Sequence, residues 1–254
     1  MRIIQISDLH FGFHNPLIIE PFLKDLSQLK PDLILISGDL TQRAKISQFK
    51  SLKIFLDCLP VPLLIVPGNH DIPLHNLFLR LLNPFKHYKH YVSPHLDMSF
   101  SNKEVNILGV NSVTPLKIKD GKLPKKTIQR IKSHFSKDSG QLNILFFHHN
   151  LNYFSGMHHP LNNAEEFINY LKESPIHIVC TGHLHYCTVK VITKNKHGNC
   201  IILHAGSLLC RRGKDKLNSF YVIDTQQLTC RIDWRVFVKD VFSSHETYDF
   251  NFSE

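Results

Sequence analysis

Five short apolar segments, separated by stretches of helical periodicity, constrain the fold of this chain more than any other feature. These segments, each typical of a strand buried on both faces, are residues 3–6, 33–37, 63–66, 144–147 and 176–180. Between most of them, apolar residues recur at the spacing of an amphipathic helix, over residues 18–29, 49–59, 128–135 and 167–171. Strands that alternate with helices predict a largely parallel sheet covered on both faces.

The last third of the chain shows strand patterns that follow one another without helices. We expect strands over residues 188–193, 200–204, 220–224 and 231–238, a turn at 196–199, and a further strand pair within 98–110. These segments favour a second, mostly antiparallel sheet. The sequence thus predicts an α/β fold, a four-layer α-β-β-α sandwich of two mixed sheets flanked by helices. Because no linker or repeat interrupts residues 1–254, we expect one domain, with the tail after residue 242 unassigned.

Polar side chains follow every one of the five apolar segments, at the point where each strand should end. In chain order they are Asp8 and His10, then Asp39, then Asn69, His70 and Asp71, then His148 and His149, and last His183 and His185. In an open α/β sheet, functional groups gather beyond the carboxyl ends of the strands, so we expect these clusters to converge. Glycine precedes three of them and permits a close approach of backbone to ligand.

The residue types in these clusters are those of a two-metal site. Two divalent cations about 3.5–4 Å apart repel each other, so an anionic group must lie between them, and Asp39 is the candidate. The histidines and Asp8 divide between the ions: Asp8 and His10 with one of His183 and His185 on the first, and His148 with the other on the second, while Asn69 offers a neutral carboxamide oxygen that limits the negative charge. Oxygen and imidazole ligands without thiolate favour Mn²⁺, Fe or Zn²⁺, and also Co²⁺ or Ni²⁺.

These motifs, spread over residues 8 to 185, resemble in order the full signature of the calcineurin-like metallophosphoesterases. The resemblance implies an α-β-β-α sandwich and two divalent metal ions. It also implies the ligand sets, which are Asp8, His10, Asp39 and His185 for the first ion and Asp39, Asn69, His148 and His183 for the second. His70 would then be the catalytic histidine. Asn150 stands where the family usually has proline, so His149 remains an alternative to His148 as ligand.

The predicted mechanism follows from such a pair of ions. A metal-bridging hydroxide would attack phosphorus, since a bound water can have a pKa of about 7 at a suitable cation. His70, held by Asp71 or another carboxylate, would act as general acid for the leaving oxygen. This mechanism predicts a metal-dependent hydrolase of phosphate esters.

The substrate is indicated by a looser resemblance. The run Gly-His-Leu-His-Tyr at 182–186, and His204-Ala-Gly-Ser followed by Arg211 and Arg212, are similar to bacterial class III cyclic-nucleotide phosphodiesterases. This resemblance implies a 3′,5′-cyclic nucleotide or another small phosphodiester, with His149, Arg211 and Arg212 as candidate substrate contacts. His70 stands where lipid A precursor hydrolases of this superfamily carry arginine, which argues against that branch.

Other histidines have no visible motif, and we expect ordinary structural roles for them, although a loop with His158 and His159 can border the site. They are His14, His75, His158, His159 and His204. Two other functions stay open. One is a metal-dependent nuclease, which the positive net charge supports but the lack of a basic helix or an aromatic platform does not. The other is a non-catalytic interaction module on the same fold. Such modules typically lose ligands, whereas here every position is filled.

Composition bears on partners and location. The net charge of +9, with 18 histidines counted as neutral, favours anionic partners such as a phosphate ester, a nucleic acid or an acidic membrane surface. No apolar run approaches the roughly 20 residues of a membrane-spanning helix. The six cysteines show no paired spacing, so we expect a reducing, cytoplasmic location. The oligomeric state cannot be deduced from the sequence.

Overall fold

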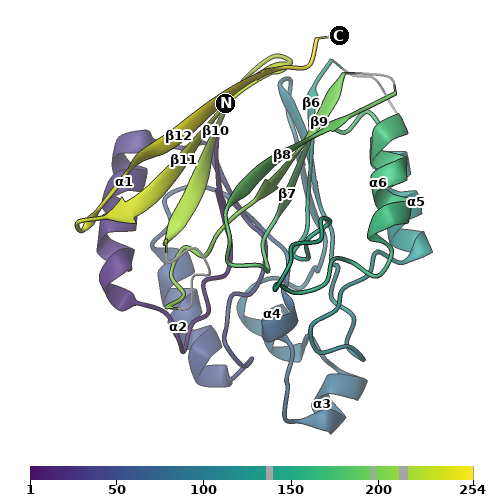
Figure 1. Ribbon diagram of the computed structural model, residues 1–254. Coiled ribbons are helices and arrows are strands. Elements are labelled where there is room, and N and C mark those ends of the chain that lie inside the picture. Colours follow the sequence, from purple (N-terminus) through teal and green to yellow (C-terminus); the bar gives the residue numbers. More distant parts are fainter. Residues whose placement is uncertain (136–139, 196–197, 212–216, 254) are drawn as a thin grey trace.

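A computed structural model of the chain shows two sheets packed face to face, with helices on both outer sides (Figure 1). It describes residues 1–135, 140–195, 198–211 and 217–253. The predicted α/β sandwich of two mixed sheets is confirmed.

The first sheet joins the first three strands of the chain to the last three. Its order is β12 (Val241–Asn251), β11 (Thr229–Val238), β10 (Ser219–Gln226), β1 (Arg2–Ile6), β2 (Leu33–Ile36) and β3 (Leu63–Ile65). Strands β1, β2 and β3 are parallel, whereas β10 pairs antiparallel with β1. The carboxyl ends of β1, β2 and β3 therefore lie at one edge.

The second sheet is built from the middle of the chain. Its order is β4 (Met98–Ser101), β5 (Val105–Gly109), β6 (Leu142–Phe146), β7 (Ile178–Thr181), β9 (Asn199–His204) and β8 (Thr188–Thr193). Strands β5, β6, β7 and β9 are parallel, with antiparallel strands at both edges.

The helices cover the outer faces. They are α1 (Ile19–Leu29) and α2 (Ile46–Asp57) on the first sheet, α5 (Lys125–His134) and α6 (Ala164–Glu173) on the second, and the shorter η1 (Pro16–Ile18), η2 (Asn69–Asp71), α3 (Leu77–Leu82) and α4 (Lys86–Tyr91). Among the described residues, none of the helices has the length and apolar character needed to span a bilayer.

Three buried apolar layers hold the sandwich together. In β2, Leu33 and Leu35 face the layer between the sheets, while Ile34 and Ile36 face α1 and α2. In β6, Ile144 faces the same central layer and Leu145 faces the layer under α5 and α6. Successive side chains of a strand point to opposite faces, so a strand buried on both sides needs an unbroken apolar run. This requirement explains the apolar segments in the sequence.

The assignment of strands to sheets differs from the sequence prediction. The five apolar segments do not share one parallel sheet, because β1–β3 lie in the first sheet and β6 and β7 in the second. The C-terminal strands divide in the same way, with β9 beside β7, β8 at the edge next to β9, and β10 beside β1. Apart from the edge strand β8, these strands are largely buried on both faces, so their local pattern does not tell which sheet they join. Residues 243–251 of the tail are part of β12.

Candidate metal centre

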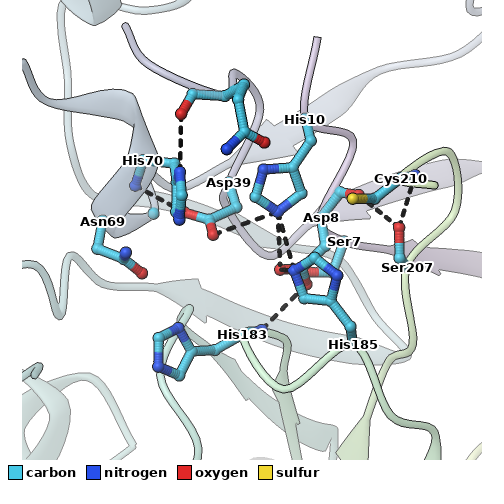
Figure 2. Close-up of polar contacts among 12 residues, drawn as sticks. Ser7, Asp8, His10, Asp39, Asn69, His70, His183, His185, Ser207 and Cys210 are labelled. Atoms are coloured by element: carbon cyan, nitrogen blue, oxygen red, sulfur yellow. Dashed lines mark hydrogen bonds and ion pairs between the residues drawn. The ribbon is translucent and has the colours of Figure 1, made fainter. Parts of the chain in front are cut away.

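The loops after β1 and β2 run side by side, and this brings Asp8, His10 and Asp39 together. The amide of Asp8 donates to the Gly38 carbonyl at 3.1 Å, and that of His10 donates to the Asp39 carbonyl at 3.0 Å. A bridge between the two sheets brings the loop after β7 close, because the amide of His183 donates to Oδ2 of Asp8 at 3.0 Å. The polar residues that follow strands far apart in the sequence thus lie close together (Figure 2).

Five of the candidate ligands have a left-handed backbone, which non-glycine residues rarely adopt. Their φ angles are 55° for Asp8, 49° for His10, 52° for Asp39, 78° for His183 and 52° for His185. Such a conformation costs of order 1–3 kcal/mol and persists only where surrounding structure enforces it. Five such positions in one cluster indicate that the loops are shaped for side-chain placement.

The preceding glycines allow the loops to come this close. A Cβ on Gly68 would lie 2.2 Å from the amide nitrogen and Oδ1 of Asp39, and one on Gly182 would lie 1.8 Å from Oγ of Ser7. Neither glycine has a positive φ. The requirement for glycine here is space rather than backbone conformation.

The side chains form two groups that share one carboxylate. In the first, the ligand atoms of Asp8, His10, Asp39 and His185 all lie within 4.8 Å of one another. In the second, those of Asp39, His148 and His183 do so, and Oδ1 of Asn69 lies 3.1 Å from Nε2 of His148. The carboxylate of Asp39 reaches both, at 3.5 Å from Nε2 of His10 and 3.3 Å from Nε2 of His148.

With neutral imidazoles, the form that binds a metal, these atoms would present lone pairs to one another rather than complementary donors. Oδ1 of Asp8 is fully buried without a hydrogen bond, and its nearest polar neighbours are Nε2 of His185 at 3.2 Å and Nε2 of His10 at 3.6 Å. The Nε2 atoms of His10 and His185 lie only 2.9 Å apart. Nδ1 of His148 lies 2.7 Å from the Ser37 carbonyl, and donating there leaves Nε2 of that ring as an acceptor that faces the cluster. Buried acceptors that face each other without donors fit divalent cations between them.

The electrostatics of the buried groups agree with this interpretation. Burial alone would raise the pKa of Asp8, but the imidazoles of His185 and His10 outweigh it and hold the pKa below its ordinary value. Burial would lower the pKa of His148 and His185, yet Asp39 raises the first to about 9 and Asp8 raises the second to about 10. The carboxylates thus stabilise positive charge inside the cluster. Without metal this charge is a proton on an imidazole, and a bound cation can replace it.

His70 lies beside the two groups rather than within them. Its ring centroid is 4.9 Å from that of His10, and its amide donates to Oδ1 of Asp39 at 2.9 Å. Nδ1 of the His70 ring lies 2.8 Å from the backbone carbonyl of Gln42. That carbonyl orients the ring, and a backbone group leaves no signal in the sequence.

Asp71 accepts hydrogen bonds from loop amides and makes none to the His70 ring. Its carboxylate is fully buried and accepts from the amides of Gly68, Leu40 and Thr41 at 2.9, 3.1 and 2.8 Å. Burial and the charge of Asp39 raise the pKa of Asp71 to about 6. Asp71 therefore fixes the loop after β3 against the loop after β2.

A pocket of about 300 Å³ opens directly beside His70 and Asn69. Its other lining residues are cationic or polar (Gln42, Arg43, Lys119 and His158) and apolar (Ile72, Leu74 and Ile118). The ring of His158 also packs 5.0 Å from that of His183. His158 thus lies where a loop that borders the site would place it, although no motif surrounds it in the sequence.

Of the three predicted substrate contacts, the structure describes two, His149 and Arg211, and they lie in different environments. His149 is fully buried behind His183, with Nδ1 2.8 Å from Oγ of Ser112, and burial lowers its pKa to about 3. His148, and not its neighbour, therefore belongs to the second group. Arg211 is exposed next to Cys210, whereas Arg212 lies outside the described residues.

Cys210 lies closer to the cluster than the sequence indicated. Its sulfur is grouped with ligand nitrogens of His10 and His185 within 4.8 Å. The amide of Cys210 donates to Oγ of Ser207, which in turn donates to the Asp8 carbonyl at 2.7 Å (Figure 2). In the sequence, Cys210 is one of six cysteines without paired spacing, so nothing in the sequence marks it as part of the site.

A two-sheet α/β sandwich with this cluster at the strand ends defines a metal-dependent hydrolase of phosphate esters. The family model described as calcineurin-like phosphoesterase matches residues 1–187, and the chain belongs to this family. The resemblance stated from the motifs is confirmed.

Three known proteins illustrate the relationship. A protein of Vesicomyosocius okutanii named "Probable cyclic nucleotide phosphodiesterase" is 26% identical over 247 residues, which cover 91% of this chain and 98% of the relative. The UDP-2,3-diacylglucosamine pyrophosphatase LpxG of Chlamydia muridarum is 42% identical, but over 77 residues, 28% of this chain and 22% of the relative. A dimetal phosphatase from Danio rerio shares the fold, with a TM-score of 0.71 at 10% identity, covering 100% of this chain and 99% of that one.

Proposed function

We propose that the two side-chain groups bind two divalent cations and that the chain hydrolyses a small phosphodiester at them. The observation that carries this proposal is the carboxylate of Asp39, which is shared by both groups. Beside it lies Oδ1 of Asp8, which is buried without a hydrogen bond. An anionic bridge is what two adjacent cations require. The first ion would be held by Asp8, His10, Asp39 and His185, and the second by Asp39, Asn69, His148 and His183. Mn²⁺, Fe and Zn²⁺ suit this donor set.

When bound, such cations supply a water of lowered pKa as nucleophile and neutralise charge on the phosphate oxygens. The rest of the chemistry belongs to the protein. His70 stands at the boundary between the cluster and the pocket, so a leaving oxygen in the pocket would receive its proton from Nε2 of this ring. The Gln42 carbonyl keeps Nδ1 protonated and the ring in place. Asp71 acts only as a positioning residue, through the loop amides it accepts from.

The pocket favours a small leaving group over a nucleic-acid duplex. Its volume of about 300 Å³ is at the lower end for sites of small ligands. Arg43, Lys119 and His158 would meet negative charge, and the apolar side chains would pack on a flat or aliphatic part. A 3′,5′-cyclic nucleotide combines both features, and the name of the Vesicomyosocius okutanii relative supports that class. Arg211 is exposed next to Cys210 and stays a candidate substrate contact, whereas His149 packs against His183 and would support that ligand.

A panel of phosphate esters, assayed after reconstitution with Mn²⁺, Fe²⁺ and Zn²⁺ separately, tests this proposal. It should contain cyclic nucleotides, linear diesters, a monoester, a nucleoside diphosphate ester and single-stranded DNA. We expect the highest kcat/KM for the cyclic diesters. Highest activity on single-stranded DNA would favour the nuclease, and no hydrolysis of any ester with any metal would favour an interaction module. Preference for the diphosphate ester would favour the chemistry named for the LpxG relative.

A further inference from the structure

Large apolar side chains lie exposed at one end of the molecule. Six of them, between 52% and 82% exposed, gather on α3 and the loop near residue 117 and form what we call the apolar end patch: Leu77, Phe78, Leu81, Leu82, Leu116 and Ile118. In Figure 1, α3 lies at the end of the molecule opposite the two chain termini. Single exposed apolar residues are ordinary, but a gathered set marks an interaction surface.

The sequence of α3 turns these side chains outward together. Leu77 and Leu81 are one helical turn apart, as are Phe78 and Leu82, so the four share one stripe. Arg80 occupies the opposite side of the helix and is buried, at 6% exposed. This pattern reverses that of an ordinary surface helix, in which the apolar stripe faces the core.

Arg80 fixes the two parts of the patch to each other. Its guanidinium donates to the carbonyls of Pro73, Pro115 and Lys117, at 2.9, 2.7 and 2.6 Å. These bonds tie α3 to the loop that carries Leu116 and Ile118. The patch is therefore a surface with a defined shape, held by a buried guanidinium each of whose three nitrogens donates a hydrogen bond.

The charges around the patch have one sign. Residues 72–96 and 112–119 contain no aspartate or glutamate, while they include Arg80, Lys86, Lys89, Lys117 and Lys119. Lys117 and Lys119 are exposed on either side of Ile118. The acidic residues that border these segments are Asp71, which is buried on loop amides, Asp97, which pairs with Arg130, and Asp120.

We propose that the apolar end patch docks on an anionic lipid bilayer. Exposed leucine and phenylalanine beside lysine, with no aspartate or glutamate within residues 72–96 or 112–119, match the interfacial zone of such a surface, where apolar side chains enter the acyl boundary and lysines meet lipid phosphates. Ile118 also lines the pocket beside His70, and its carbonyl accepts from Nδ2 of Asn69 at 3.3 Å. If the proposed phosphodiesterase function holds, docking places the pocket at the depth of lipid headgroups.

Cosedimentation with vesicles tests the proposal without any enzymatic readout. The full chain is mixed with vesicles of phosphatidylcholine alone, or with about 30 mol% phosphatidylglycerol, at low and high salt. The double variant Phe78→Ser/Leu82→Ser is compared with Leu17→Ser/Ile54→Ser, which removes two equally exposed apolar side chains elsewhere, at 77% and 69%. Thermal unfolding verifies that both variants are folded, and sedimentation velocity without lipid gives the oligomeric state.

We expect binding to the anionic vesicles that weakens with salt, a loss of about tenfold or more in the patch variant, and no change in the control variant. Equal binding by both variants, or no binding of the unchanged chain to anionic vesicles, would overturn the proposal. So would a dimer that the patch variant alone converts to a monomer, because the occupant would then be a second copy of the chain. Because no substrate is used, these outcomes are independent of whether the proposed activity is correct.

Discussion

At the scale of single residues, a substitution of His70 can test its proposed role as general acid directly. The His70→Ala variant should keep both metals, since His70 belongs to neither ligand group. Its kcat on an alkyl phosphodiester should fall by about 10²–10⁴, because an alkoxide leaves poorly without a proton. Its kcat on a p-nitrophenyl diester should fall much less, because that leaving group is already acidic.

Elemental analysis and the two kcat ratios measure this. The control is His75→Ala, an exposed histidine outside the pocket lining, which should change neither ratio. An equal loss on both esters would show that His70 does not act as the acid.

Gly68 tests how the loops hold the cluster. At a φ of −107° its backbone suits any residue, but a Cβ there would lie 2.2 Å from Asp39. Gly68→Ala should therefore lower the free energy of unfolding by about 1–3 kcal/mol and weaken metal binding, through displacement of Asp39.

Urea unfolding in chelator, with metal titration afterwards, measures both effects. Gly156→Ala is the comparison, because its φ of +74° is strained while the space around it is open, so it should cost about 1 kcal/mol and leave metal affinity unchanged. If both variants bound metal alike, the close approach at Gly68 would not matter for the site.

How much of the site the sequence predicts depends on whether a residue is part of a motif. The candidate ligands were found because their types repeat after each apolar segment, and the structure brings them together. The Gln42 carbonyl and Cys210 were missed, since a backbone group and a buried cysteine carry no pattern of their own, and His158 was expected only as part of a loop that can border the site. Asp71 was predicted as a partner of His70, and the structure instead places it on loop amides.

At the scale of elements, a buried ion pair joins α1 to β11. Arg235 donates to both carboxylate oxygens of Asp25, at 2.8 Å each, with the two side chains 15% and 7% exposed. Arg235→Met should lower the free energy of unfolding by about 3 kcal/mol, because it leaves the carboxylate of Asp25 buried without its partner.

Urea unfolding measures this loss, with Arg231→Met on the same strand as the control. Arg231 is exposed, and its replacement should change stability by less than about 0.5 kcal/mol. Similar losses for both variants would mean that the pair does not fasten the helix to the sheet.

The elements themselves were largely predictable, and their partners were not. Segments 33–37 and 63–66 appear as β2 and β3, and helical spacing located α1, α2, α5 and α6. Sheet membership failed because Ile34 and Leu145 alike sit in strands buried on both faces, so neither strand shows an alternation that marks its neighbours. The short α3 was missed because its stripe of exposed leucines does not follow the pattern of a helix that covers a core.

At the scale of the whole molecule, bound metal should contribute to stability. Asp8 and Asp39 are buried carboxylates from loops of the same sheet, and His183 comes from the other sheet, so cations would join the two halves of the sandwich. Binding at 100 times Kd stabilises by about 2.7 kcal/mol per ion, which corresponds to roughly 5–10 °C in Tm for a chain of this size.

Thermal unfolding with and without a chelator measures the shift, and the metal restored after chelation should recover it. The variant Asp39→Asn, which lacks the shared charge, should show a much smaller response. A Tm that is the same with chelator as with metal would mean that the cluster is held together without cations.

The central claim is that Asp39 bridges two cations, and anomalous X-ray diffraction from crystals grown with Mn²⁺ tests it most directly. The account predicts two anomalous peaks per chain, about 3.5–4 Å apart, one on the side of His10 and His185 and one on the side of Asn69 and His148. No peak within coordination distance of Asp39, or a single peak to which its carboxylate does not bridge, would contradict the account.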